Sequence, residues 1–400
     1  MSLKSILPDR VSFHAKLILF GNILGGFGDG INVVFQLYLI SIGFGSTEIG
    51  TLLMIKTIGT ALLTIPAGIL ADRYGKRKIM LFCFSFHSLG LILGRLTAKS
   101  LGMFCLGELL VGLGDAVWVL TTPLYSSFFD NENMDRAFGL HSFLQIIAVS
   151  TGSLLGFIPP ILVSGYGFSL QESYWTMLVI SSGCFLARIP FFIMSTRGVI
   201  ETERQGGFKF NLRSKDVVAK FCFINSVGII GNGVFFNFFS FYANRKFGVE
   251  SGALGTLAFV SRFVQAGANI IAARISGKLG TIKTIAVTIG LSTPFYLMIP
   301  MAPNFTWLSV IFIIRLGMIS LSSPLRSSLF MKLLYDEEKA TASSITSMVS
   351  QGSNIVAPWL GGQLMEQVSL DFPAYLGAGL FAIYAASHYL LRRNEKEKPI

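Results

Sequence analysis

Long apolar runs separated by short polar segments follow one another along the whole chain. Each run has the ~20 or more residues that a helix needs to cross a bilayer. The first six runs cover residues 16–41, 47–71, 77–97, 101–128, 134–163 and 173–197, and the second six cover 217–243, 251–275, 281–301, 305–330, 340–365 and 372–391. The pattern predicts an all-α membrane protein with twelve transmembrane helices. We expect an N-terminal six-helix bundle at 1–197, a cytoplasmic linker at 198–216 and a C-terminal six-helix bundle at 217–400.

The composition favours a membrane protein over a soluble one. Hydrophobic residues make up 52% of the 400 residues and charged residues only 13%, whereas roughly a quarter are charged in soluble domains. The mean hydropathy is +0.64. The net charge of +11 comes from short segments between apolar runs, which favours topology signals and anionic-lipid contacts over nucleic-acid binding. The four cysteines lie in apolar runs without metal-ligand spacing, so we expect buried thiols, no metal and no cofactor.

Lysine and arginine are distributed unequally between the two sets of loops. They concentrate at the N-terminus, after the even-numbered runs and in the C-terminal tail, whereas the other loops hold mainly Lys99, Arg245 and Lys246. Because basic loops stay on the cytoplasmic side, both termini are predicted in the cytoplasm. The expected location is the plasma membrane, as a multi-pass monomer in the lipid bilayer.

The two halves resemble each other in sequence. Residues 122–129 (TPLYSSFF) match residues 323–330 (SPLRSSLF), and residues 68–75 (GILADRYG) match residues 273–280 (ARISGKLG). In the second pair Gly280 matches Gly75, but Gly277 replaces Asp72. Two repeats related along the membrane normal predict a central cavity between them.

Residues 68–78 (GILADRYGKRK) carry a family resemblance through Gly68, Asp72, Arg73, Gly75 and Arg77. This segment is similar to the signature loop between spans two and three of the major facilitator superfamily. The resemblance implies the fold of that family and a rocker-switch secondary transporter.

The resemblance also implies a latch, in which the loop acid lies near the start of span eleven and a basic residue near the end of span four. Asp72 would be the acid of that latch, and Arg136 is the nearest basic candidate. The alternative is that the basic cluster of the loop only anchors the topology.

Span four departs from the family pattern. Many proton-coupled members have arginine where this chain has Glu108, ahead of the glycines Gly112 and Gly114. The usual proton-relay role of that position is therefore in doubt. Glu108 is kept as a candidate for proton coupling, with a structural pair to Arg95 as the alternative.

Acids within the first half are candidates for coupling, because ionisable residues in mid-membrane are costly and usually functional. Asp29 lies among glycines in span one and suits a proton carrier, or else forms a fixed pair with Lys56. Asp115 lies seven residues after Glu108 and shares its helix face. Spans one and four line the cavity in the resembled family, which implies that Asp29 and Asp115 reach the substrate.

Bases and amides supply the candidates of the second half. Arg315 in span ten and Arg262 in span eight suit a substrate anion, since arginine binds carboxylate or phosphate in a fixed geometry. Arg188 in span six is a further candidate for such a contact, and for Arg262 and Arg188 the alternative is a structural ion pair or a snorkelling end. The remaining cavity candidates are the amides Asn232, Asn237 and Gln36, with interhelical hydrogen bonds as their alternative.

The pattern of motifs favours a proton-driven secondary transporter, since the chain has no phosphate-binding loop. We expect a small-molecule substrate, protons or another coupling ion, and export of small organic or amphiphilic compounds. Import of an organic anion or zwitterion is the alternative. A sensor on a transporter fold or a membrane enzyme is more remote, and no enzymatic activity is expected.

Overall fold

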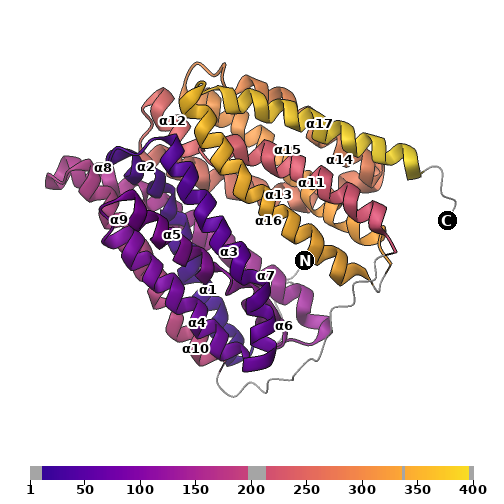
Figure 1. Cartoon of the computed structure of the whole chain (residues 1–400), viewed down its shortest axis with the longest axis horizontal. Coiled ribbons are helices and arrows are strands. Elements are labelled where there is room, and N and C mark those ends of the chain that lie inside the picture. The colour runs from indigo at the N-terminus through magenta and orange to yellow at the C-terminus, as the bar shows by residue number, and fades with distance from the viewer. Residues whose placement is uncertain (1–10, 197–212, 336–337, 396–400) are drawn as a thin grey trace, which may run out of the picture. The chain divides into compact units, whose positions relative to one another are not determined.

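A computed structural model describes residues 11–196, 213–335 and 338–395. Every regular element in these ranges is helical, so the all-α fold class is confirmed (Figure 1). The elements of the first half are α1 (Phe13–Ile31), η2 (Asn32–Val34), α2 (Phe35–Ser41), α3 (Ser46–Tyr74), α4 (Lys76–Leu91), η3 (Ile92–Leu96), α5 (Leu101–Asp115), α6 (Trp118–Ser126), α7 (Asn131–Leu154), η4 (Leu155–Phe157), α8 (Ile158–Tyr166), α9 (Leu170–Ala187) and α10 (Ile189–Ser195). Those of the second half are α11 (Lys215–Phe236), α12 (Phe239–Phe247), α13 (Ser251–Leu279), α14 (Thr281–Met298), α15 (Phe305–Lys332), α16 (Lys339–Gln367) and α17 (Phe372–Glu395).

Helix occupies all twelve of the expected spans, and several spans consist of two consecutive helices. Within the described ranges, nine helical segments are long and apolar enough to cross a membrane. The other three expected spans coincide with α14, α16 and α17. That all twelve cross the bilayer therefore stays a prediction.

The chain forms two compact units. Unit 1 comprises Met1–Phe44, Ile55–Gln205 and Glu250–Phe259, and unit 2 comprises Gly45–Met54, Gly206–Val249 and Val260–Ile400. In unit 1, α1 packs against α7, α9 and α10, and α4 packs against α5. In unit 2, α11 lies beside α16 and α17, and α14 lies beside α15 and α17 (Figure 1).

The first turn of α3 belongs to unit 2 and is fixed there by the end of α16. The Ser46 hydroxyl donates to the Gly362 carbonyl at 2.9 Å, and the Thr47 backbone N–H donates to Glu366 Oε2 at 2.9 Å. A carboxylate is favourable at this position because a helix N-terminus carries partial positive charge. The start of α13 is held in unit 1 by a similar contact, from the Ser251 hydroxyl to the Gly156 carbonyl at 2.7 Å.

The sequence repeat at Gly75 and Gly280 is also a repeat of backbone conformation. Gly75 precedes α4 with φ 94° and ψ 136°, and Gly280 precedes α14 with φ 83° and ψ 148°. Only glycine adopts these angles without strain. The resemblance of the two halves therefore extends to the local structure of these turns.

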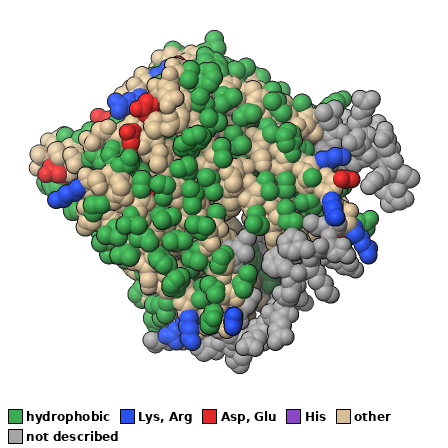
Figure 2. All heavy atoms as spheres, in the orientation of Figure 1, with side chains coloured by type: hydrophobic (Ala, Val, Ile, Leu, Met, Phe, Trp, Pro, Cys, Tyr) green, Lys and Arg blue, Asp and Glu red, His purple; other side chains and the backbone are tan. Residues whose placement is uncertain are grey.

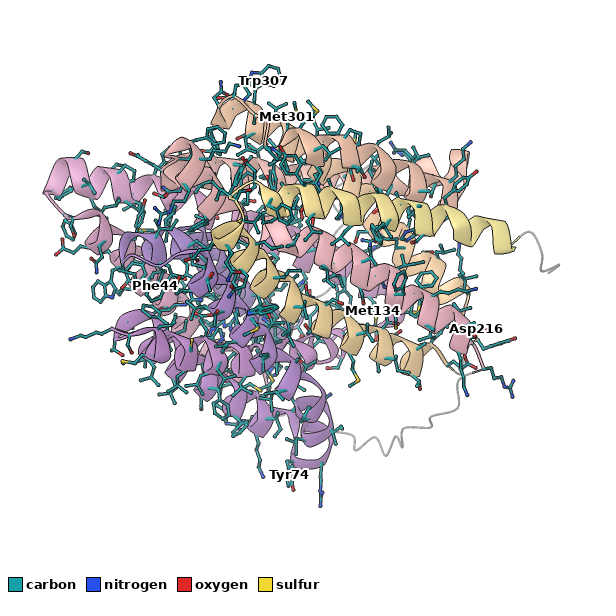
Figure 3. All side chains as sticks on the ribbon, turned by 45° about the horizontal axis from the view of Figure 1, so that its top comes forward. Phe44, Tyr74, Met134, Asp216, Met301 and Trp307 are labelled. Carbon is teal, nitrogen blue, oxygen red and sulfur yellow. The ribbon has the colours of Figure 1, made fainter. Side chains whose placement is uncertain are left out.

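The outer surface is largely apolar. Figure 2 shows hydrophobic side chains spread over the face drawn, with lysine, arginine and acidic side chains gathered near its border. Met301 and Trp307, which are 76% and 56% exposed, project outward near the turn between α14 and α15 (Figure 3). An apolar exterior suits lipid, because hydrocarbon cannot hydrate charge.

Candidate functional site

A polar cavity of about 70 Å³ lies inside unit 1. It draws its lining from the helices of spans one to four and span six. The lining residues are Asp29, Asn32, Lys56, His87, Arg95, Val111, Asp115, Trp118, Phe185 and Arg188. The cavity thus brings together Asp29 and Asp115, which the sequence predicted, with bases that the sequence did not assign to a site.

Four helices of unit 1 are irregular at residues that line this cavity. Helix α1 gives way to the 3-10 turn η2 at Asn32, and α4 gives way to the π-helical turn η3, which contains Arg95. Helix α5 ends at Asp115, and Arg188 stands between α9 and α10. In a membrane, irregular backbone is tolerated where it faces protein or a wet cavity, and such turns often mark functional positions.

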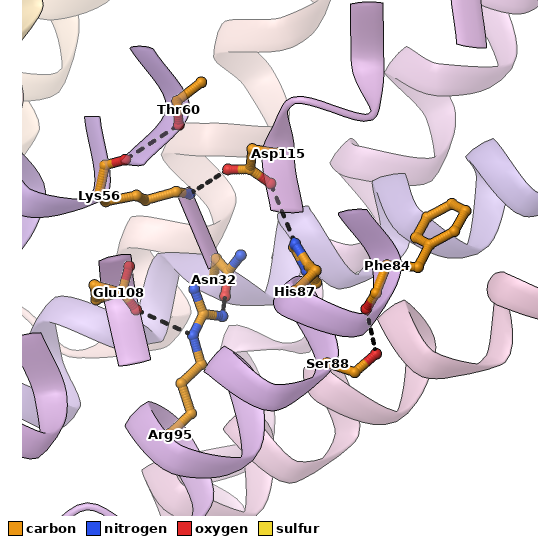
Figure 4. Close-up of polar contacts among 9 residues, drawn as sticks. All are labelled: Asn32, Lys56, Thr60, Phe84, His87, Ser88, Arg95, Glu108 and Asp115. Atoms are coloured by element: carbon orange, nitrogen blue, oxygen red, sulfur yellow. Dashed lines mark hydrogen bonds and ion pairs between the residues drawn. The ribbon is translucent and has the colours of Figure 1, made fainter. Parts of the chain in front are cut away.

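Asp115 is held by two neighbouring side chains. Lys56 Nζ lies 3.1 Å from Asp115 Oδ2, and His87 Nδ1 lies 3.3 Å from Asp115 Oδ1 (Figure 4). The alternative in which Lys56 pairs with Asp29 is therefore wrong. Lys56 is committed to Asp115 because α3 and α5 approach closely: a Cβ added to Gly112 would lie 2.0 Å from the Lys56 carbonyl oxygen.

Glu108 and Arg95 form a second, fully buried pair. Their side chains are 3% and 4% exposed, and Arg95 Nε lies 3.5 Å from Glu108 Oε1 (Figure 4). Arg95 also donates to Asn32 Oδ1 at 2.6 Å and lies 4.8 Å from the Phe35 ring centroid. The structural pair expected as the alternative role of Glu108 is confirmed.

Asp29 differs from both other acids of the cluster. It is exposed although it lies in the middle of span one, and it has no hydrogen bond or ion pair with another described residue. Arg188 exerts the strongest attraction on it among the charged groups. Asp29 is thus an exposed carboxylate on a helix of span one that lines the polar cavity without a fixed partner.

Arg188 is buried, with 1% of its surface exposed. Its guanidinium carbon lies 5.0, 5.4 and 5.6 Å from the ring centroids of Phe185, Trp118 and Phe84. No carboxylate lies within 4 Å of it in the described part of the chain. The structural ion pair and the snorkelling end, expected as alternatives for Arg188, are therefore both wrong, since the side chain is buried where α9 ends and α10 begins, next to Pro190.

Unit 2 holds Arg315 in a comparable aromatic setting. Its guanidinium carbon lies 3.9, 4.1 and 4.6 Å from the ring centroids of Phe236, Tyr296 and Phe381. Its Nη2 donates to Asn232 Oδ1 at 3.3 Å. The structure thus brings together two of the residues predicted for the cavity, Arg315 and Asn232.

The remaining predicted residues are more scattered. Arg262 is exposed on α13, while Asn237 lies at the break between α11 and α12. Gln36 and Asn237 are both engaged in contacts.

The latch prediction cannot be followed through the side chain of Asp72, which lies outside the described residues. Gly68, Asp72 and Arg73 belong to the end of α3, and Arg77 belongs to the start of α4. Arg77 and Arg136 each have interactions of their own.

Sequence reasoning missed the roles of Lys56 and His87. Each is an ionisable residue in the middle of an apolar run, and this was the available signal, because a charge in a membrane helix needs a partner. The identity of the partner depends on helix rotation and packing, which the pattern of apolar residues leaves open.

Comparison with known proteins gives a family and a fold. A model of the Major Facilitator Superfamily matches residues 18–353 and, in a second match, residues 221–400. A probable metabolite transport protein of Saccharomyces cerevisiae is 30% identical over 162 residues, which are 38% of this chain and only 28% of that protein.

Solved transporter structures superpose on nearly the whole chain. A mutant of the nucleoside transporter NupG gives a TM-score of 0.75 at 14% identity, covering 94% of this chain and 99% of that chain. A bacterial homologue of the human lysosomal transporter Spinster, inward-facing and unoccupied, gives 0.73 at 14% identity, covering 95% and 96%. The POT family transporter PepTSo gives 0.74 at 12% identity, covering 98% and 99%. At these identities the likeness supports the fold alone.

Proposed function

We propose that this chain, which belongs to the Major Facilitator Superfamily, is a proton-coupled secondary transporter of a small organic molecule. In this proposal Asp29 carries the coupling proton. The chain works by alternating access in the plasma membrane, with both termini in the cytoplasm. The two six-helix halves are the moving parts.

The observation that carries the proposal is the contrast between Asp29 and the other two acids of the cluster. Asp115 is fixed by Lys56 and His87, and Glu108 is buried against Arg95. Because each of these two carboxylates is already held against a cation, we do not assign proton transfer to either of them. Asp29 is exposed and without such a partner, and its protonation state is free to follow the pH on the side to which it opens.

The other charges of unit 1 have supporting roles in this mechanism. Asp115 and Lys56 keep the interior of unit 1 polar next to Asp29, and a proton that leaves Asp29 passes close to them. Glu108 and Arg95 join α5 to η3 at the cavity wall. Asp72 with Arg136 remains our candidate for the latch of the signature loop.

Two directions of transport were open from the sequence, and the site favours import of an organic anion over export of an amphiphilic compound. Arg188 and Arg315 are both buried, with no carboxylate within 4 Å in the described part of the chain. A buried arginine without a fixed counter-charge suits a ligand that brings its own negative charge. Export would draw instead on the aromatic residues of α11 and α12, among which Phe236 already contacts Arg315.

Transport by purified protein in proteoliposomes tests the coupling. A compound that raises the thermal unfolding midpoint in a metabolite screen serves as the labelled substrate. An inwardly directed proton gradient should drive its accumulation, and dissipating the gradient should abolish that accumulation. Asp29→Asn should keep counterflow, which needs no net proton movement, and lose the response to pH.

Asp371→Asn is the matched control, because Asp371 pairs with Lys246 in unit 2 at 2.7 Å, away from the cavity. Accumulation by Asp29→Asn equal to that of the parent protein would exclude Asp29 as the proton carrier.

A further inference from the structure

The guanidinium of Arg188 has unused hydrogen-bonding capacity inside the cavity. Its Nε and Nη2 atoms are buried and have no hydrogen-bond acceptor among the described residues. An arginine side chain can donate five hydrogen bonds, and leaving buried donors unsatisfied is unfavourable. The aromatic rings around Arg188 stabilise its charge but accept no conventional hydrogen bond. The site is therefore incomplete without an acceptor that enters the cavity.

The charges around the cavity show which group lacks a partner. Lys56 is matched by Asp115, and Arg95 is matched by Glu108. Only Arg188 and Asp29 remain, and no ion pair within 4 Å joins them. With Asp29 ionised, the three acids balance the three bases. With Asp29 protonated, one positive charge is left over, and it is the charge of Arg188.

The cavity is shaped for a small acceptor. Its volume of about 70 Å³ is several times the ~10–15 Å³ of space that one water molecule needs, which leaves room for one carboxylate group. Arg188, His87 and Arg95 are buried in its wall, whereas Asp29 is exposed, so the cavity opens at Asp29. A ligand of larger size would place only its charged end inside.

We propose that Arg188 binds the carboxylate of an anionic substrate in this cavity, and that the anion binds more tightly when Asp29 is protonated. The inference rests on the proposed function, because it uses Asp29 as the proton carrier. The planar guanidinium matches a carboxylate through two parallel hydrogen bonds, and Nε and Nη2 are the free pair. Trp118 and Phe185 lie beside the guanidinium and line the cavity, so their rings can pack against the body of the substrate.

Charge balance sets the stoichiometry of this step. One proton is taken up by Asp29, and one monoanion is taken up by Arg188, so the net charge of the occupied cavity equals that of the empty cavity with Asp29 ionised. No covalent bond is made or broken. The change of access therefore moves no net charge with the occupied cavity. The cargo is a monocarboxylate in symport with one proton.

Other charged groups near Asp29 also affect its carboxylate, but they do not take over the proton or the anion. Lys56 on α3, Arg95 in η3 and Arg188 attract the Asp29 carboxylate, while Asp115 at the end of α5 repels it. His87 on α4 faces Asp115 rather than Asp29. Because Lys56 and Arg95 have acids of their own, the competition that changes with pH is between Asp29 and the incoming carboxylate for Arg188.

Binding of benzoate to the purified full-length protein tests the inference. Benzoate carries one carboxylate and a ring that can pack on Trp118, and benzamide is its neutral counterpart of the same shape. Quenching of tryptophan fluorescence is titrated at pH 5.5 and pH 7.5, where benzoate stays ionised, since carboxyl groups titrate near pH ~4. The parent protein should bind benzoate more tightly at pH 5.5 and should bind benzamide weakly at both pH values.

The variants separate the two charges. Asp29→Asn should tighten benzoate binding at pH 7.5 by about tenfold and remove the pH dependence, because a nearby like charge is lost. Arg188→Gln should abolish benzoate binding at both pH values. Arg188→Lys should weaken binding, because an ammonium group cannot make the two parallel hydrogen bonds of the guanidinium. Arg326→Gln is the control, since Arg326 is a half-buried arginine bonded to Tyr384 in unit 2, outside the cavity. If Arg188→Gln does not fold, Arg188→Lys and Asp29→Asn still decide the outcome.

The results distinguish this inference from the proposed function. Equal binding of benzoate and benzamide, or benzoate binding that Asp29→Asn and Arg188→Lys leave unchanged, would overturn the anion site. The proton-gradient experiment would then still decide whether Asp29 couples transport of a different cargo. Loss of proton coupling with a pH-dependent anion site intact would instead reject the transport mechanism and retain the binding site.

Discussion

Unit 1 and unit 2 each bury an arginine among three aromatic rings, but only unit 1 surrounds it with other charged residues. In unit 1, Lys56 and Arg95 have acidic partners. In unit 2, Arg315 is 2% exposed and relies on aromatic rings and the amide of Asn232. Opposite charges stabilise each other in a poorly solvated interior. If one of them is removed, the other is left buried without a counter-charge, which is strongly destabilising.

The effect of a buried charge on stability depends on whether an opposite charge, or only aromatic rings and an amide, stabilises it. Removing one member of a pair leaves the other member buried and uncompensated. Removing a charge that is compensated only by rings and one amide leaves no opposite charge behind. The loss of a single charged group should therefore destabilise the protein more when the group belongs to a pair in unit 1 than when it is Arg315 in unit 2.

The largest effect is expected for Glu108→Gln in unit 1. The substitution leaves Arg95 buried without its counter-charge, so the free energy of unfolding should fall by about 3–5 kcal/mol. Unfolding in mixed detergent micelles measures the change. The double variant Arg95→Met with Glu108→Met removes both charges and should recover most of the loss. A single variant as stable as the parent would show that the pair contributes little and would weaken the contrast between the units.

A smaller effect on stability is expected for Arg315→Met in unit 2. Loss of the hydrogen bond to Asn232 costs roughly 0.5–1.5 kcal/mol, and relief from burying a charge opposes that cost. We expect the free energy of unfolding to change by no more than about 1.5 kcal/mol. Transport, in contrast, should be lost, because Arg315 is our candidate for a substrate contact in unit 2. The same unfolding and counterflow assays measure both quantities. A destabilisation as large as that of Glu108→Gln would contradict the comparison.

Much of the fold followed from the sequence because hydrophobic runs and basic loops are local signals. The match of Gly75 with Gly280 and the Arg95–Glu108 pair depend on residues close in sequence or on one helical hairpin. The partner of Lys56 did not follow, because it depends on the close approach of α3 and α5 at Gly112. The settings of Arg188 and Arg315 did not follow either. Their rings come from helices far apart in the chain, such as Phe84 on α4 for Arg188 and Phe381 on α17 for Arg315.

The smallest effect is expected for Glu338, a charged group of unit 2 that is paired with a helix end rather than with a base. Its carboxylate accepts hydrogen bonds from the backbone N–H groups of Ser214, at 2.9 Å, and Arg213, just before α11. Burial acts to raise the pKa of Glu338, but these N–H groups outweigh it and hold the pKa below its usual value. The repeat places Asp135 at the corresponding position in the first half.

A lowered folded pKa means that Glu338 stabilises the protein when it is ionised. The contribution is fully present above the ordinary glutamate pKa of ~4.3 and is lost as the pH falls toward the lower folded value. Glu338→Gln should therefore lower the thermal unfolding midpoint slightly at pH 7, and the difference from the parent should shrink as the pH falls below ~4. Glu338→Asp, which keeps the charge on a shorter side chain, should recover part of the loss. If the difference in unfolding midpoint between Glu338→Gln and the parent grew on acidification, Glu338 would stabilise the protein in its protonated form. The assignment of an ionised carboxylate at the start of α11 would then be wrong.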